Sequence, residues 1–117
     1  SALQSHIHVI GDAALANPMP KSAFAANAQA GLCAVQVARL LAGEAPVDTT
    51  LINTCYSLVA PGYGISVADV YRPAEQSWKP VTGAGGTSAL DADADVRRRE
   101  AGYAASWFAT ITAEVFG

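Results

Sequence analysis

The sequence has little charge, few cysteines and histidines, and no long apolar run, and each shortage excludes a class of protein. A net charge of -3 and a pI near 5.1 argue against a nucleic-acid partner, which would require a basic face. No apolar stretch approaches the roughly 20 residues that span a bilayer, so no membrane span is expected. Two cysteines, Cys33 and Cys55, and two histidines, His6 and His8, predict neither a disulfide scaffold nor a metal site.

Two motifs of redox proteins are also missing. No CxxCH occurs, so this chain cannot attach a c-type haem covalently. No GxGxxG follows an apolar strand, because the glycines of residues 83–86 have neither the spacing nor a preceding buried strand. That turn holds the pyrophosphate of a bound dinucleotide, so a complete dinucleotide-binding site is not expected in this chain.

Apolar residues are what the sequence has in quantity. Hydrophobic residues make up 51% of the chain and charged residues only 15%. A small soluble domain has much surface to cover with polar groups. The composition therefore predicts that the chain either buries surface against another protein or is cut from a larger one, and we favour the second interpretation.

The first part of the chain predicts a strand and a long helix. Residues 6–10 are an apolar run ended by Gly11, which is typical of a buried parallel strand. A helix is predicted from about Lys21 to Ala42, with prolines before its first turn and Gly43 after its end. Its few clearly polar residues are Asn27, Gln29, Gln36 and Arg39. A helix that is apolar nearly all round is normally buried in a larger body.

After Pro46 the pattern changes to short strands. Residues 49–59, 65–71 and 77–82 are rich in β-forming residues, and turn residues separate them. They predict a three-stranded antiparallel meander, followed by a glycine-rich loop over residues 83–86.

A last helix is predicted to begin near residues 91–95, whose acidic side chains suit its amino end. Four residues are spaced to form one stripe along it: Val96, Tyr103, Trp107 and Ile111. The arginines at 97–99 follow three aspartates, which favours a solvated helix start. The predicted fold class is α+β, with a strand-and-helix piece at residues 1–46 and a small α+β domain at residues 47–117.

Gly11-Asp12-Ala13-Ala14 is the sharpest local signal for a binding site. A carboxylate at the end of a parallel strand can accept hydrogen bonds from ligand hydroxyls, and glycine allows close approach. The following helix points its positive amino end toward the same place. On spacing alone, a plain strand-to-helix turn explains these residues as well as a ligand site does.

The remaining candidate residues have structural explanations of equal or greater weight. Cys33 fits a buried small hydrophobe in its helix, and Cys55 fits an ordinary strand cysteine. A Cys33–Cys55 bridge would need the helix and the strand to meet, and nothing in the sequence requires it. On residue type alone, Trp107 is a core residue of the last helix.

Several longer segments, in order, resemble one family. Residues 7–14 resemble the second FAD motif of flavoproteins with two dinucleotide-binding domains. The segments 17–29, 51–57, 63–67, 70–73 and 107–117 are similar to the flavoprotein subunit of flavocytochrome c sulfide dehydrogenase. The resemblance covers essentially the whole chain. It implies that the chain is the carboxy-terminal part of a FAD-dependent enzyme that oxidises sulfide, holding the end of the FAD domain and a terminal α+β domain.

The resemblance also implies roles for particular residues. Asp12, beside Gly11, would bind the ribityl hydroxyls of FAD, and the backbone at Lys21 and Ser22 would lie against the flavin N1–C2 edge. Trp107 would pack near the isoalloxazine ring. No metal is implied.

Cys55 is the catalytic residue that the resemblance implies. It would be one half of a redox-active disulfide over the flavin, where sulfide attacks and leaves a persulfide. The other cysteine would belong to the missing amino-terminal part of the same flavoprotein, as would the GxGxxG turn that holds the FAD pyrophosphate, so catalysis by this chain alone is not expected. Electrons would pass singly to a separate cytochrome c subunit, which alone carries haem, in the periplasm.

Two alternatives remain open at this point. A fragment of a sulfide:quinone oxidoreductase would call for a membrane-facing apolar carboxy terminus, and residues 110–117 offer too little. A non-catalytic docking or dimerisation domain is the other alternative, because an exposed apolar helix over residues 21–42 would recruit a partner or a second copy.

Overall fold

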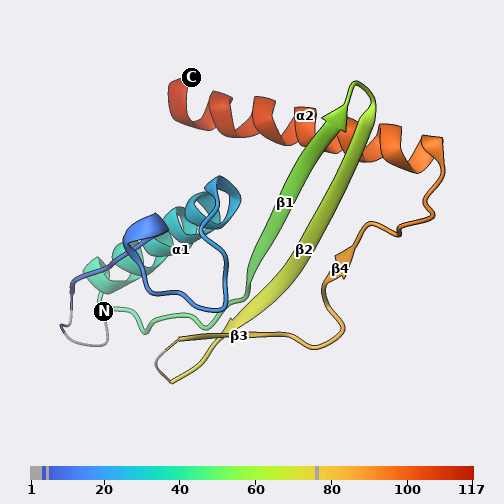
Figure 1. The fold of residues 1–117 in the computed structure, drawn as a ribbon. Coiled ribbons are helices and arrows are strands. Elements are labelled where there is room, and N and C mark those ends of the chain that lie inside the picture. Colours follow the sequence, from blue (N-terminus) through green and yellow to red (C-terminus); the bar gives the residue numbers. More distant parts are fainter. Residues whose placement is uncertain (1–3, 5, 76) are drawn as a thin grey trace. The chain divides into compact units, whose positions relative to one another are not determined.

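The structure is a computed structural model that describes residue 4, residues 6–75 and residues 77–117 (Figure 1). Its elements in chain order are η1 (Gly11–Ala13), α1 (Ala23–Leu41), β1 (Leu51–Ala60), β2 (Tyr63–Pro73), β3 (Trp78–Pro80), β4 (Gly86–Thr87) and α2 (Ala94–Phe116). Helices and a small antiparallel sheet make up the α+β class that the sequence predicts.

The chain divides into two compact units. The first contains residues 1–53 and 69–84, and the second contains residues 54–68 and 85–117. Residues 1–3 and 5, which belong to the predicted piece 1–46, lie outside the described part of the chain. The domain boundary near Pro46 stays a prediction.

Helix α1 lies within two residues of its predicted bounds because local signals fix both ends. Ser22 caps the start, where its Oγ accepts a hydrogen bond from the Ala25 N–H at 3.0 Å. At the other end Gly43 has a φ of +71°, and the Glu44 N–H donates to the Arg39 carbonyl at 2.9 Å. This is the Schellman arrangement, which satisfies carbonyls that the last turn leaves open.

The core of the first unit lies where α1 meets the ends of two strands. Met19, Ala25, Leu51 and Tyr71 are buried together, and Trp78 packs against them. Strand β3 pairs antiparallel with the end of β2, with Pro73 opposite Trp78. The loop before α1, the helix and the sheet thus share one small core.

The predicted strand at residues 6–10 is not formed. Residues 7–10 have no assigned secondary structure, although Ile10 is extended, with φ and ψ of -133° and 169°. The Ile7 side chain is 53% exposed. A parallel strand exists only by hydrogen bonding to a neighbour, and none of the described strands pairs with this segment. The prediction was wrong because the pattern shows an apolar run without showing its partner.

The sheet has the order β1-β2-β3, with β4 paired to β2. Pro61-Gly62 joins β1 to β2, and the φ of +69° at Gly62 suits the second central position of a tight turn. The predicted meander is therefore confirmed. The predicted loop at residues 83–86 was wrong at Gly86, which pairs with Ala68 in the two-residue strand β4. A strand that short has no periodicity to detect.

Helix α2 begins as predicted, since Asp93 caps it by accepting a hydrogen bond from the Val96 N–H at 2.8 Å. Its most buried residues are Arg97 and Ala104, with Trp107 and Ile111 half-buried. Tyr103 is 59% exposed, so it lies outside the stripe predicted for it. The solvated start predicted for the arginine run was wrong for Arg97, whose side chain finds partners within its unit.

Candidate functional site

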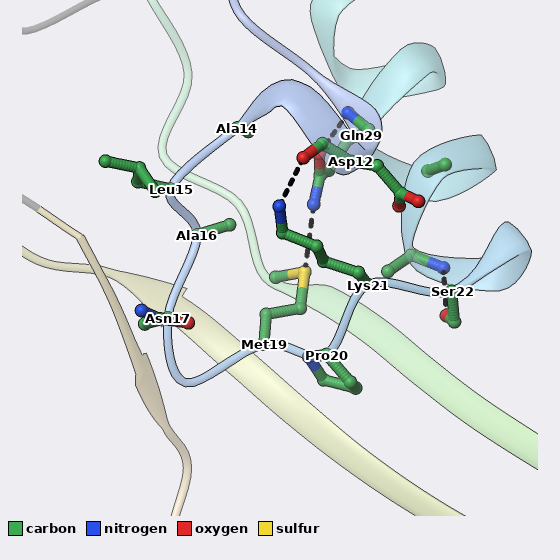
Figure 2. Close-up of a pocket in the computed structure, with 13 residues that line it drawn as sticks. Asp12, Ala14, Leu15, Ala16, Asn17, Met19, Pro20, Lys21, Ser22 and Gln29 are labelled. Carbon is green, nitrogen blue, oxygen red and sulfur yellow. Dashed lines mark hydrogen bonds between the residues drawn. The ribbon is translucent and has the colours of Figure 1, made fainter.

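The Gly11-Asp12 turn forms the 3-10 helix η1 beside α1 (Figure 2). Gly11 has a φ of +64°, a conformation that favours glycine, and its N–H donates to Gln29 Oε1 at 2.8 Å. Lys21 Nζ donates to the main-chain carbonyl of Asp12 at 2.5 Å. The Asp12 residue is exposed, and no group among the described residues donates to its carboxylate. This carboxylate can therefore accept hydrogen bonds from the hydroxyls of a ligand.

A cavity of about 80 Å³ lies between this turn and the start of α1. Four residues predicted to bind the cofactor line it: Gly11, Asp12, Lys21 and Ser22. Sites that enclose a whole small molecule measure about 300–1,000 Å³. This cavity could therefore receive a few atoms of a ligand but not a whole small molecule.

Ser22 uses its side chain within the protein. Besides capping α1, its Oγ donates to Asn53 Oδ1 at 2.5 Å. Asn53 is 2% exposed and lies in β1, so this bond joins the start of the helix to the strand. The hydroxyl thus has a donor and an acceptor within the protein, whereas the resemblance gives a role to the backbone of Ser22. Sequence analysis missed Asn53, although a polar residue in a β-forming run was a usable signal.

Cys55 and Trp107 both belong to the second unit. Cys55 is a half-buried cysteine in β1, and no disulfide joins it to Cys33. The Trp107 ring lies 6.3 Å from the ring of Tyr56, with the two planes inclined by 37°. Successive side chains of a strand point to opposite faces. Cys55 is therefore on the face of β1 opposite to Tyr56, and on the same face as Asn53, two residues earlier.

A larger apolar cleft of about 710 Å³ adjoins the cavity beside Asp12 in the first unit and shares Ala14, Leu15, Ala16 and Gln29 with it. Its lining includes His8, Leu32, Cys33, Leu51 and Trp78, but none of the predicted cofactor residues. Cys33 is a free cysteine there, half-buried rather than fully buried. Among the described residues, no group of three or more histidine, cysteine or acidic side chains gathers to bind a metal.

Arg97 is the centre of a polar cluster in the second unit that the sequence did not reveal. Its Nη2 donates to the Ala89 carbonyl at 2.6 Å, and its guanidinium lies over the Tyr63 ring, 5.2 Å from the centroid. Glu100 accepts hydrogen bonds from Ser88 Oγ at 2.6 and 2.7 Å. Ser88 Oγ in turn accepts from the Ser66 N–H at 2.7 Å. The cluster ties α2 to the hairpin and to the loop before the helix.

An α+β unit that bears a carboxylate on a small cavity at a helix start is consistent with the carboxy-terminal piece of a flavoprotein. The particular family follows from a comparison with family models. The model described as flavocytochrome c sulphide dehydrogenase, flavin-binding, matches residues 47–116, which is more than half of the chain. The chain belongs to this family, whose cofactor is FAD and whose name implies a cytochrome c partner. None of the described helices is long and apolar enough to cross a membrane.

Proposed function

We propose that this chain forms one wall of the FAD site in a sulfide dehydrogenase that passes electrons to a cytochrome c subunit. Membership of the flavin-binding family carries the proposal. The cavity that gathers Gly11, Asp12, Lys21 and Ser22 supports it within the first unit. The rest of the site would come from other parts of a larger flavoprotein.

FAD, when bound, supplies a centre that takes two electrons from a substrate and releases them one at a time. The Asp12 carboxylate would hold the ribityl hydroxyls, because charge-assisted hydrogen bonds are stronger than neutral ones. Lys21 already holds the Asp12 carbonyl, so it fixes the turn that carries this carboxylate. The amino end of α1 would favour electron-rich atoms of the flavin edge beside Ser22.

Cys55 would act as one half of a disulfide whose other cysteine lies in another part of the flavoprotein. Sulfide would attack one sulfur of that bond, which breaks, leaving a persulfide on one cysteine and a thiolate on the other. A strand position supports this role because it holds the sulfur rigidly. We place the enzyme in the periplasm, where a cytochrome c partner would receive its electrons.

Replacing Cys55 tests its proposed role in sulfide oxidation separately from the binding of FAD. In the flavoprotein that contains this chain, we expect Cys55→Ser to abolish sulfide oxidation while the visible spectrum of bound FAD persists. Cys33→Ser is the matched control, since Cys33 is also a half-buried cysteine but lies in α1. Sulfide turnover by Cys55→Ser equal to that of Cys33→Ser would refute the role given to Cys55.

A second candidate, a docking or dimerisation role, is favoured by the apolar side chains that remain exposed. Leu41 of α1 is 83% exposed, and Val35 and Ile7 are about half exposed. Such surface tends to recruit another polypeptide. We propose the remainder of the flavoprotein as that polypeptide rather than a second copy. A dimer of the isolated chain in analytical ultracentrifugation would indicate that the surface binds a second copy. A monomer at high concentration would count against dimerisation.

A further inference from the structure

We infer that Gln29 is the positioning residue that holds the Gly11-Asp12 turn in its ligand-binding conformation. The inference rests on the proposed function, because it concerns the same cavity. It goes beyond that function by assigning a positioning role to a residue of α1 whose side chain contacts the turn.

Gln29 uses both ends of its amide on the two segments that border the cavity. Its Oε1 accepts the hydrogen bond from the Gly11 N–H at 2.8 Å, and its Nε2 donates to Met19 Sδ at 3.3 Å. Figure 2 shows the side chain between the turn that bears Asp12 and the segment that leads to Lys21. One side chain thus joins the two segments that carry the predicted cofactor residues.

Because Gln29 is buried, loss of its hydrogen bonds is expected to disturb the turn. Gln29 is 8% exposed, and Met19, at its other end, belongs to the core of the unit. The Gly11 N–H is partly buried, so it would keep part of its desolvation cost if it lost its acceptor. Without the Gln29 carbonyl, the Gly11 N–H would have to turn toward water, which would carry the Asp12 carboxylate with it.

Gln36, about two turns further along α1, provides a matched comparison. Its Nε2 donates to the Val47 carbonyl at 2.6 Å, and its Oε1 accepts from the Val47 N–H at 3.2 Å. Both glutamines therefore join α1 to the backbone of another segment. Only Gln29 reaches the turn of the cavity, since Gln36 does not line it.

The experiment compares Gln29→Met with Gln36→Met, because methionine keeps the length of the side chain and removes its hydrogen bonds. In the flavoprotein that contains this chain, FAD affinity is measured by fluorescence titration of the apoprotein. Hydrogen exchange at the Gly11 amide, measured by NMR in this chain, reports on the turn without any flavin. The melting temperature of each variant measures the loss of stability common to both.

We expect Gln29→Met to weaken FAD binding about tenfold, the equivalent of one lost hydrogen bond, and to speed exchange at Gly11. Gln36→Met should leave both unchanged at a similar melting temperature. Equal FAD affinity in the two variants, or an unchanged Gly11 exchange rate in Gln29→Met, would overturn the inference and leave the proposed function standing. Failure of the unsubstituted flavoprotein to bind FAD would overturn both.

Discussion

At the scale of single residues, Gly64 lies directly against the backbone of α2. A Cβ placed on Gly64 would lie 2.7 Å from the Glu100 carbonyl carbon and closer still to the Ala101 nitrogen. Those are backbone atoms of a helix, which cannot move aside as a flexible side chain can. Glycine at this position is therefore required by packing and not by an unusual φ.

We expect Gly64→Ala to destabilise the protein by about 1–3 kcal/mol, the usual cost of overpacking. Gly102→Ala is the matched control, since a Cβ there meets nothing within 4 Å. It should stabilise the protein by about 0.5–1 kcal/mol, because alanine is the better helix former. Chemical denaturation measures both changes, and a destabilisation by Gly102→Ala equal to that by Gly64→Ala would contradict the packing argument.

Arg97 shows how a charged residue can belong to a core. Its side chain is 4% exposed, yet it has the Tyr63 ring and the Ala89 carbonyl as partners. We predict that Arg97→Ala costs about 3 kcal/mol or more, because it leaves a cavity and unpaired carbonyls. Arg98→Ala should cost less than about 1 kcal/mol, since Arg98 is exposed and its ion pair with Asp95 is exposed as well. Thermal unfolding that ranks the two variants in the opposite order would refute this assignment.

At the scale of elements, the bond between Ser22 and Asn53 connects α1 to β1. The same hydroxyl caps the helix and donates to the strand, so both elements depend on one side chain. Asn53 is followed two residues later by Cys55 on the same face of β1. The bond therefore holds the first residues of β1 at the start of the helix.

A double-mutant cycle tests this connection. We expect Ser22→Ala and Asn53→Ala to be coupled by at least about 0.5 kcal/mol in stability, as residues in direct contact are. Ser22→Ala combined with Ser57→Ala should be additive, because Ser57 is an exposed residue of the same strand. An additive result for Ser22 and Asn53 would mean that the bond contributes nothing to the joining of the two elements.

The elements that sequence analysis predicted correctly are those whose ends depend on local chemistry. Ser22 and Gly43 bound α1, and Asp93 begins α2. The strand at residues 6–10 could not be judged in the same way, because a strand depends on a partner elsewhere in the chain or outside it. The prediction that Arg97 is solvated was wrong for a similar reason, since it also depended on neighbours in the sequence. Its neighbours in sequence are charged, whereas its partners, such as Tyr63, are distant in sequence.

The candidate site was predicted in part. Resemblance to a family singled out Gly11, Asp12, Lys21 and Ser22, and the structure gathers all four around one cavity. Their role with FAD, and those of Cys55 and Trp107, stay predictions. The bonds of Gln29 and Asn53 were not predicted, because hydrogen bonds between segments 18 and 31 residues apart leave only a weak signal in the sequence, a polar residue in an apolar setting.

At the scale of the whole molecule, the composition and the exposed apolar surface both indicate that this chain packs against another polypeptide. Half of the residues are hydrophobic, yet the cores are small and many large apolar side chains are exposed. The cavity beside Asp12 is large enough for only part of a cofactor. We therefore propose that both the apolar surface and the FAD site are completed by other parts of a flavoprotein.

The visible absorption spectrum of the purified flavoprotein, with and without Asp12→Ala, tests the central claim most directly. We predict an oxidised flavin band that Asp12→Ala weakens or removes, since a lost hydrogen bond to a charged group costs about 1.5–3 kcal/mol. Asp48→Ala, at another exposed aspartate of the first unit, should leave the band intact. A colourless unsubstituted protein, or a flavin band as strong in Asp12→Ala as in Asp48→Ala, would contradict the claim that this chain forms a wall of the FAD site.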